Sequence, residues 1–179
     1  AAKAFTKYKV KLRQLSYGAI LLPFVIPEII IAVSLIVLWT GMGLQLGLVP
    51  VTISHILFCT PFCMLVLISR MEGFDRNLEE AAMDLGENAW GTFWRVTFPL
   101  ALPAIVASLL LSFVISFDEF ILAFFLSSHD QTLPLYMWGQ LRFPKKLPHV
   151  LALGAVIIVA TSIVVMLSYW LRNLGSPSG

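Results

Sequence analysis

Carboxylates are scarce in this chain, and most of them occupy two settings in which a negative charge does specific work. Glu80, Asp84 and Glu87 recur at helical spacing on one face of a segment between two long apolar stretches. Glu28 and the pair Asp118–Glu119 lie inside apolar stretches instead. A charged surface helix can dock on a partner, whereas a carboxylate within a membrane faces the bundle interior or a water path and attracts cations.

The composition is that of a membrane protein. The chain has 179 residues, of which 59% are hydrophobic and 12% are charged, and its mean hydropathy is +0.89. A helix that crosses a bilayer needs about 20 apolar residues, and four stretches reach that length: 18–39, 49–68, 100–126 and 150–171. The net charge of +2 is too small to indicate a nucleic-acid partner. We therefore predict an all-α, polytopic transmembrane bundle of about four spans, forming a single domain.

The positive charges indicate how such a bundle is oriented. If four spans place both ends on one side, nine of the twelve Lys and Arg residues lie on that side: Lys3, Lys7, Lys9, Lys11, Arg13, Arg70, Arg76, Arg95 and Arg172. The other side holds Arg142, Lys145 and Lys146. Because positive residues concentrate in cytoplasmic loops, both ends are predicted to be cytoplasmic. Residues 1–17 then form a basic cytoplasmic segment, 70–98 a cytoplasmic loop and 127–148 an external loop.

The loop at 70–98 is predicted to contain a short helix. Apolar residues recur at i, i+3, i+4 and i+7 on one face: Leu78, Ala81, Ala82 and Leu85. Asp75 or Asn77 can cap its start, and Gly86 is placed to end it. A short aromatic turn and then Pro99 are expected to separate this helix from the next span. On periodicity alone, the favoured interpretation is a helix that lies on the membrane surface and packs against its own domain.

The spacing of this loop matches a known pattern. Glu80-Ala81-Ala82, three residues, Gly86, nine residues and then Val96-Thr97-Phe98-Pro99 resembles the EAA loop of ABC importer permeases, which reads EAA, three residues, G, nine residues, I-x-L-P. The resemblance implies a type I importer fold in which this loop is a coupling helix, docked in a cleft of a cytoplasmic ATPase. It assigns coupling to six positions: Glu80, Ala81, Ala82, Asp84, Gly86 and Pro99.

Glu28 is predicted to lie deep in the first span. Pro23 and Pro27 precede it, four residues apart on one face, and weaken the helix there. If the helix enters the membrane at Gly18, Glu28 is about 15 Å deep, near the middle of a core about 30 Å thick. A charge there costs about 2.5–3.5 kcal/mol. We interpret Glu28 as part of a substrate path. A structural carboxyl group, paired with a neighbouring helix or protonated, is the alternative.

Asp118 and Glu119 are predicted near the outer end of the third span, about 27 Å from its start. In an unbroken helix, Glu119 shares a small polar face with three serines, Ser108, Ser112 and Ser116, and so faces the interior. A break at 116–118 would change that assignment. Another face carries a stripe of phenylalanines: Phe113, Phe117, Phe120 and Phe124. Phe117 and Phe120 are candidates for cation–π contacts of about 0.5–2 kcal/mol each, with simple packing as the alternative.

The remaining polar groups of the spans are interpreted as packing. Cys59 and Cys63 are read as small thiols between helices and not as a metal or disulfide site. His55 is read as a hydrogen-bonded packing residue. The chain has no GxxxxGK[ST], HExxH or GxSxG motif, so we predict no cofactor or metal in this chain and no enzymatic activity of its own.

The resemblance extends over residues 21–171. Its matching segments are PEIIIAVSL, SHILFCTPF, GFDRNLEEAAMDLG, LSFVISFDEF and TLPLYMWGQLR. They resemble the permeases of spermidine/putrescine importers, whose polycationic substrates would be attracted by the acids of the spans. The resemblance implies a bacterial inner membrane, a second permease subunit, two ATP-binding subunits that use ATP and Mg, and an external substrate-binding protein. Related permeases have about six spans, so two are expected upstream of Ala1; a naturally short form is the alternative.

Two other functions stay open at this point. The first is an importer permease for another small solute, such as an iron complex. The more distant one is a non-ABC channel or structural membrane protein, whose charged helix is only interfacial. Acids inside the spans fit transport or conduction better than a passive scaffold.

Overall fold

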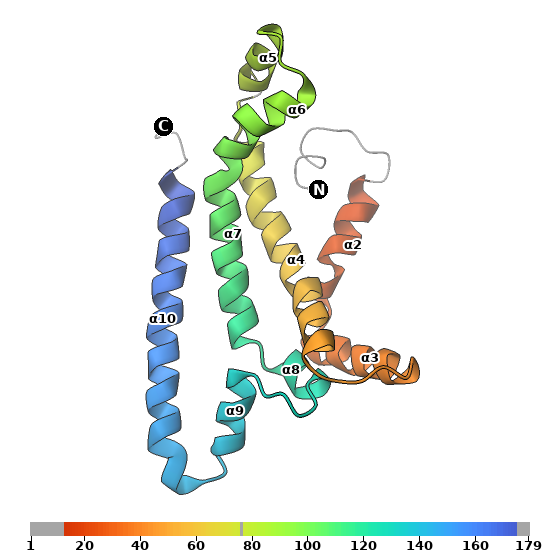
Figure 1. Ribbon diagram of the computed structural model, residues 1–179, viewed down its shortest axis with the longest axis vertical. Coiled ribbons are helices and arrows are strands. Elements are labelled where there is room, and N and C mark those ends of the chain that lie inside the picture. The colour runs from red at the N-terminus through yellow and green to blue at the C-terminus, as the bar shows by residue number, and fades with distance from the viewer. Residues whose placement is uncertain (1–12, 76, 175–179) are drawn as a thin grey trace.

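The computed structural model describes residues 13–75 and 77–174, and within these ranges every regular element is a helix (Figure 1). In chain order they are α2 (Arg13–Val25), α3 (Glu28–Gly41), α4 (Leu48–Glu72), α5 (Asn77–Asp84), α6 (Ala89–Thr92), the π-helix η1 (Phe93–Thr97), α7 (Phe98–Asp118), α8 (Ile121–Leu126), α9 (Leu133–Gln140), the 3₁₀-helix η2 (Pro144–Lys146) and α10 (Leu147–Leu174). Most of the predicted basic segment, 1–12, lies outside the described residues, as do Arg76 and residues 175–179.

Three described helical runs are long and apolar enough to cross a membrane: Leu48–Ser69, Ala89–Asp118 and Pro144–Leu171. The bent pair Gly18–Val25 and Glu28–Gly41 makes a fourth if it is counted as one span. The chain is therefore an all-α, multi-pass membrane protein, and the prediction of about four spans is confirmed.

The first predicted span is not one straight helix. α2 and α3 meet at an angle of 104°, so the depth calculated for Glu28 along a straight helix is wrong. Pro27 is the physical cause, because a proline has no N–H to donate and disfavours helical geometry in the residue before it. Pro27 itself has extended backbone angles, φ −53° and ψ 132°, and Glu28 begins the new helix α3.

α7 is the central helix of the bundle. It packs against α4 and α10, and all three lie side by side in Figure 1. Its buried positions are small: Ala101, Ala104, Ala107 and Ser108. Small side chains let helix backbones approach closely, which is how helices associate in lipid. A hydrogen bond also joins α7 directly to α10: the Ser168 hydroxyl of α10 donates to the Ala107 carbonyl of α7 at 3.0 Å.

The third predicted span is broken near its outer end, a point that the sequence left open. α7 ends at Asp118, Glu119 has extended angles of φ −67° and ψ 120°, and α8 begins at Ile121. The loop that follows α8 contains the short helix α9. α8 and α9 lie at the end of the molecule opposite α5 and α6 (Figure 1).

The expected aromatic turn before the third span is wrong. Residues from Ala89 to Asp118 form one helical run, in which the aromatic residues belong to α6 and η1. Pro99 does not stop this helix. A proline ring collides with the carbonyl four residues earlier in a regular α-helix, and the preceding π segment, where the Phe98 N–H donates to the Phe93 carbonyl, is wider. The widened turn accommodates Pro99 without ending the helix.

Candidate functional site

Two regions hold the predicted functional residues, and they lie at opposite ends of the molecule (Figure 1). The first is the loop built from α5, α6 and η1. The second is the junction where the two broken helices α3 and α8 begin.

Little of the surface of α5 is covered by the rest of the chain. Of its predicted apolar face, only Ala82 is buried, while Leu78 and Leu85 are 46% and 88% exposed. Glu80, Ala81 and Asp84 are exposed as well. The reading in which this face packs against its own membrane domain is therefore wrong for most of the face. An amphipathic helix whose apolar side chains are not covered by its own chain is typical of a surface that contacts another protein or the membrane.

Gly86 ends α5 as predicted, and the backbone shows why glycine is required. The Gly86 N–H donates to the Met83 carbonyl at 2.9 Å, and the Glu87 N–H donates to the Ala82 carbonyl at 3.1 Å. This pair of bonds is the Schellman motif, which needs a left-handed residue at the position of Gly86. Gly86 has φ +92°. At the start of the helix, the Asp75 carboxylate accepts from the Asn77 N–H at 2.9 Å.

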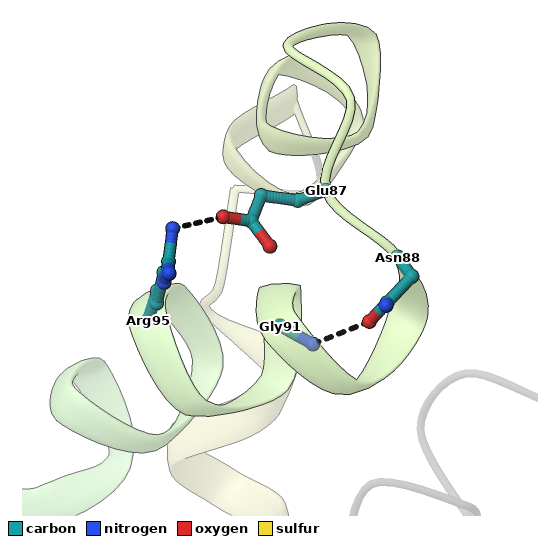
Figure 2. A network of polar contacts seen from close by, with 4 residues as sticks. All are labelled: Glu87, Asn88, Gly91 and Arg95. Atoms are coloured by element: carbon teal, nitrogen blue, oxygen red, sulfur yellow. Dashed lines mark hydrogen bonds and ion pairs between the residues drawn. The ribbon is translucent and has the colours of Figure 1, made fainter.

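Two carboxylates of the loop bind the following helix, and sequence reasoning missed both partners. The Thr97 hydroxyl donates to Glu79 Oε1 at 2.6 Å. Arg95 forms an ion pair with Glu87, which the helical spacing had placed on the outward acidic face (Figure 2). The Asn88 side chain caps α6 by accepting from the Gly91 N–H at 2.8 Å. The partners of Glu79 and Glu87 are 18 and 8 residues away, which is beyond the reach of any local helical pattern.

The second region brings together two of the predicted pathway acids. Glu28 begins α3, and Glu119 precedes α8, whose Leu122 N–H donates to Glu119 Oε1 at 2.7 Å. α3 packs on α8 through Ile31, Ala32 and Leu122, and Glu28 and Glu119 are close enough for their charges to interact. Glu119 is 8% exposed. It is buried because it caps α8, not because it shares a face with the serines of α7.

Asp118 stands apart from this pair. It is the last residue of α7, and it is exposed. The structure therefore gives the adjacent acids different surroundings, with the Glu119 carboxylate bound to backbone and Asp118 open to solvent or a ligand.

The serine face of α7 is used for packing against α4. Ser116 Oγ lies 2.7 Å from His55 Nδ1, and Ser112 Oγ lies 2.9 Å from Cys63 Sγ. Cys59 donates to the Ser112 carbonyl at 3.7 Å. His55 and the two cysteines are thus packing residues between helices, as predicted. No group of three or more His, Cys, Asp or Glu residues in the described part of the chain is placed to hold a metal ion.

The helix break also divides the phenylalanine stripe. Phe117 stays on α7 and stacks on Phe113, with ring centroids 5.6 Å apart. Phe120 lies beyond the break, 5.6 Å from Phe124 and 5.8 Å from Trp138 of α9. The Arg142 guanidinium lies over the Trp138 ring at 5.9 Å. The Trp138 ring of this cluster already contacts the Arg142 cation, and Trp138 joins the cluster through a tertiary contact that the sequence pattern does not reveal.

The family comparison agrees with this architecture of apolar spans and an exposed, charged loop helix. Residues 1–177 match the family described as the inner membrane component of binding-protein-dependent transport systems. The chain belongs to this family.

Individual relatives are similar over most of the chain. The spermidine/putrescine transport system permease protein PotC of Escherichia coli is 33% identical over 168 residues, 93% of this chain and 63% of the relative. Its namesake from Haemophilus influenzae is 34% identical over 168 residues, 93% of this chain and 65% of the relative. The putrescine transport system permease protein PotI of E. coli is 33% identical over 156 residues, 83% of this chain and 55% of the relative. The chain thus spans about three fifths of the length of these relatives.

Proposed function

We propose that this chain is a permease subunit of an ABC importer, in which α5 docks on a cytoplasmic ATPase. The exposed α5 carries the proposal. It presents Glu80, Asp84 and an almost fully exposed Leu85 at one end of the molecule, in a loop whose spacing is that of the EAA pattern. Family membership supports the same assignment and disfavours the channel and structural alternatives.

The partners and orientation follow from this proposal. The assembly comprises a second permease subunit, two ATP-binding subunits and an external substrate-binding protein, and this chain hydrolyses no ATP itself. The positive-inside count places α5 in the cytoplasm of a bacterial cell, together with the start of α2 and the end of α10. These segments lie toward the same end of the molecule, which supports the assignment (Figure 1).

The mechanism is alternating access. ATP-driven closure of the ATPase pair displaces α5, and the helical run from Ala89 to Asp118 carries the displacement to the external end of the bundle. The cavity then opens outward to receive solute from the binding protein. Hydrolysis resets the inward-facing state.

A polyamine is the solute that the site favours. Glu28, Asp118 and Glu119 supply negative charge near the break in α7, and Phe120 and Trp138 supply aromatic faces that attract ammonium groups. The names of the relatives, which are transport permeases for spermidine and putrescine or for putrescine, support the same class. Another small solute, such as an iron complex, is the second candidate.

The test is ATP hydrolysis by the reconstituted complex with its binding protein, in the presence of spermidine, putrescine or a neutral sugar. Stimulation by the polyamines alone is the expected result. Stimulation by none of the three, with the complex intact, would reject the polyamine assignment. Failure of any ATPase to co-purify with the permease pair would reject the coupling role of α5.

A further inference from the structure

The contacts of the cytoplasmic loop attach both ends of α5 to one short segment. Near the start of α5, Glu79 accepts a hydrogen bond from Thr97 at 2.6 Å. Just after its end, Glu87 pairs with Arg95 (Figure 2). Thr97 and Arg95 both belong to the π-helix η1, which continues directly into α7.

The two contacts reach η1 from different sides. The Arg95 side chain is 75% exposed, whereas Thr97 is 2% exposed and faces the protein interior. Residues two positions apart lie on roughly opposite sides of an α-helix or of the slightly wider π-helix, because about half a turn separates them. The loop therefore contacts η1 on two sides. Two such contacts restrain α5 against rotation as well as translation.

The absence of a side chain at Gly91 leaves room for the Glu87 carboxyl group of the ion pair. The Glu87 carboxyl group lies against the first turn of α6 (Figure 2), and a Cβ added at Gly91 would collide with that group. Asn88 caps the same turn through the Gly91 N–H. A larger residue at position 91 would push Glu87 away from Arg95, so the glycine and the ion pair form one arrangement.

The run from Ala89 to Asp118 is one helical rod of 30 residues, and α5 is joined to it by the turn around Gly86. Without further contacts, that turn would act as a hinge and absorb a push on α5. We propose that the Glu79–Thr97 and Glu87–Arg95 contacts form a two-point clamp that makes α5 and α7 move as one body. Displacement of α5 by the ATPase is thereby delivered to the outer end of α7, where Asp118 lies. This inference rests on the proposed function.

The Glu87–Arg95 half of the clamp is separable from folding, whereas the Glu79–Thr97 hydrogen bond is part-buried. An exposed ion pair contributes little to stability, so its loss should leave the bundle folded. Its effect is on transmission, which is measured as putrescine imported per ATP hydrolysed by the complete complex in proteoliposomes. We expect Glu87→Gln, Arg95→Gln and Thr97→Val to lower this ratio about fivefold or more, the size of a modest coupling between sites. Subunit co-purification and ATP hydrolysis should persist.

Conservative and control variants separate the clamp from a general loss of charge. Arg95→Lys keeps a cation, and Thr97→Ser keeps the hydroxyl donor, so both should retain most of the ratio. Lys145→Gln removes an exposed positive charge from η2, between α9 and α10, and should leave the ratio unchanged. The double variant of Glu87→Gln and Arg95→Gln should be no worse than the worse single variant, because both remove the same contact.

A second measurement does not depend on the solute. In a background with Cys59→Ser and Cys63→Ser, Asp118→Cys is labelled by a membrane-impermeant maleimide, with and without ATP and vanadate. Nucleotide should change the labelling rate, and Glu87→Gln should abolish that change. A nucleotide response that survives in Glu87→Gln and Thr97→Val, or additive losses in the double variant, would overturn the clamp. A wild-type complex that never couples ATP to uptake would instead overturn the proposed function.

Discussion

At the scale of single residues, the loop uses neighbouring groups for different tasks. Ala82 is buried and packs α5 against its own chain, whereas Ala81 is exposed. The same division separates Asp118, which is exposed, from Glu119, whose carboxylate is bound to the backbone of α8. Adjacent residues of one chemical type therefore have different surroundings.

Gly86→Ala should destabilise the loop that contains α5. Glycine holds φ +92° there, and a residue with a Cβ in left-handed backbone costs about 1–2 kcal/mol. Nothing surrounds a Cβ added at position 86, so the penalty is conformational and not a collision. Gly18→Ala is the matched control, because an added Cβ there also meets open space and the backbone is helical. Thermal unfolding and ATPase co-purification of the two variants check this; equal effects would contradict it.

Glu28→Gln should impair uptake of a polycation more than uptake of a neutral solute. The substitution removes one charge from the junction of α3 and α8 while keeping the size of the side chain. We expect about a tenfold rise in the half-saturating polyamine concentration, equivalent to about 1.4 kcal/mol. Asp130→Asn, at an exposed position of the loop between α8 and α9, is the control. Equal losses for charged and neutral solutes would indicate a packing role for Glu28.

At the scale of elements, the bundle depends on where helices approach and where they break. α7 places its small residues against its neighbours, and its serines face the histidine and cysteines of α4. Sequence reasoning predicted the number of spans and the packing roles of these groups, because apolar length and small-residue spacing are local properties. Sequence reasoning predicted the first span as one straight helix and missed the bend between α2 and α3. The direction of a bend at a proline depends on what the following helix packs against, which is not a local property.

Ala107→Leu should disrupt the centre of the bundle. Ala107 has no exposed surface, and its carbonyl accepts the Ser168 hydroxyl of α10. Extra methyl groups in a filled interface cost about 1–3 kcal/mol. Val106→Leu is the matched control. Val106 is the neighbouring residue and is 36% exposed, so the substitution should be nearly neutral. A thermal unfolding midpoint that falls equally in both variants would contradict the close approach of these helices.

At the scale of the whole molecule, one end of the chain carries the exposed, charged helix α5. Toward the opposite end, α3 packs on α8, and each of these helices follows a break in a predicted span. The local pattern around Gly86 and the EAA spacing were enough to predict the helix α5 and its end. The ion pair of Glu87 with Arg95 and the cluster around Trp138 were not predictable, because their partners come together only through tertiary packing. One helical run, from Ala89 to Asp118, joins the two ends.

Site-specific photocross-linking tests the central claim that α5 is the docking surface for an ATPase. The photoreactive residue is placed at Leu85, which is 88% exposed, and for comparison at Leu141, which is 50% exposed at the opposite end. In the intact complex, we expect a cross-link to the ATPase from position 85 and none from position 141. A complex that holds together yet gives no ATPase cross-link from position 85 would contradict the account.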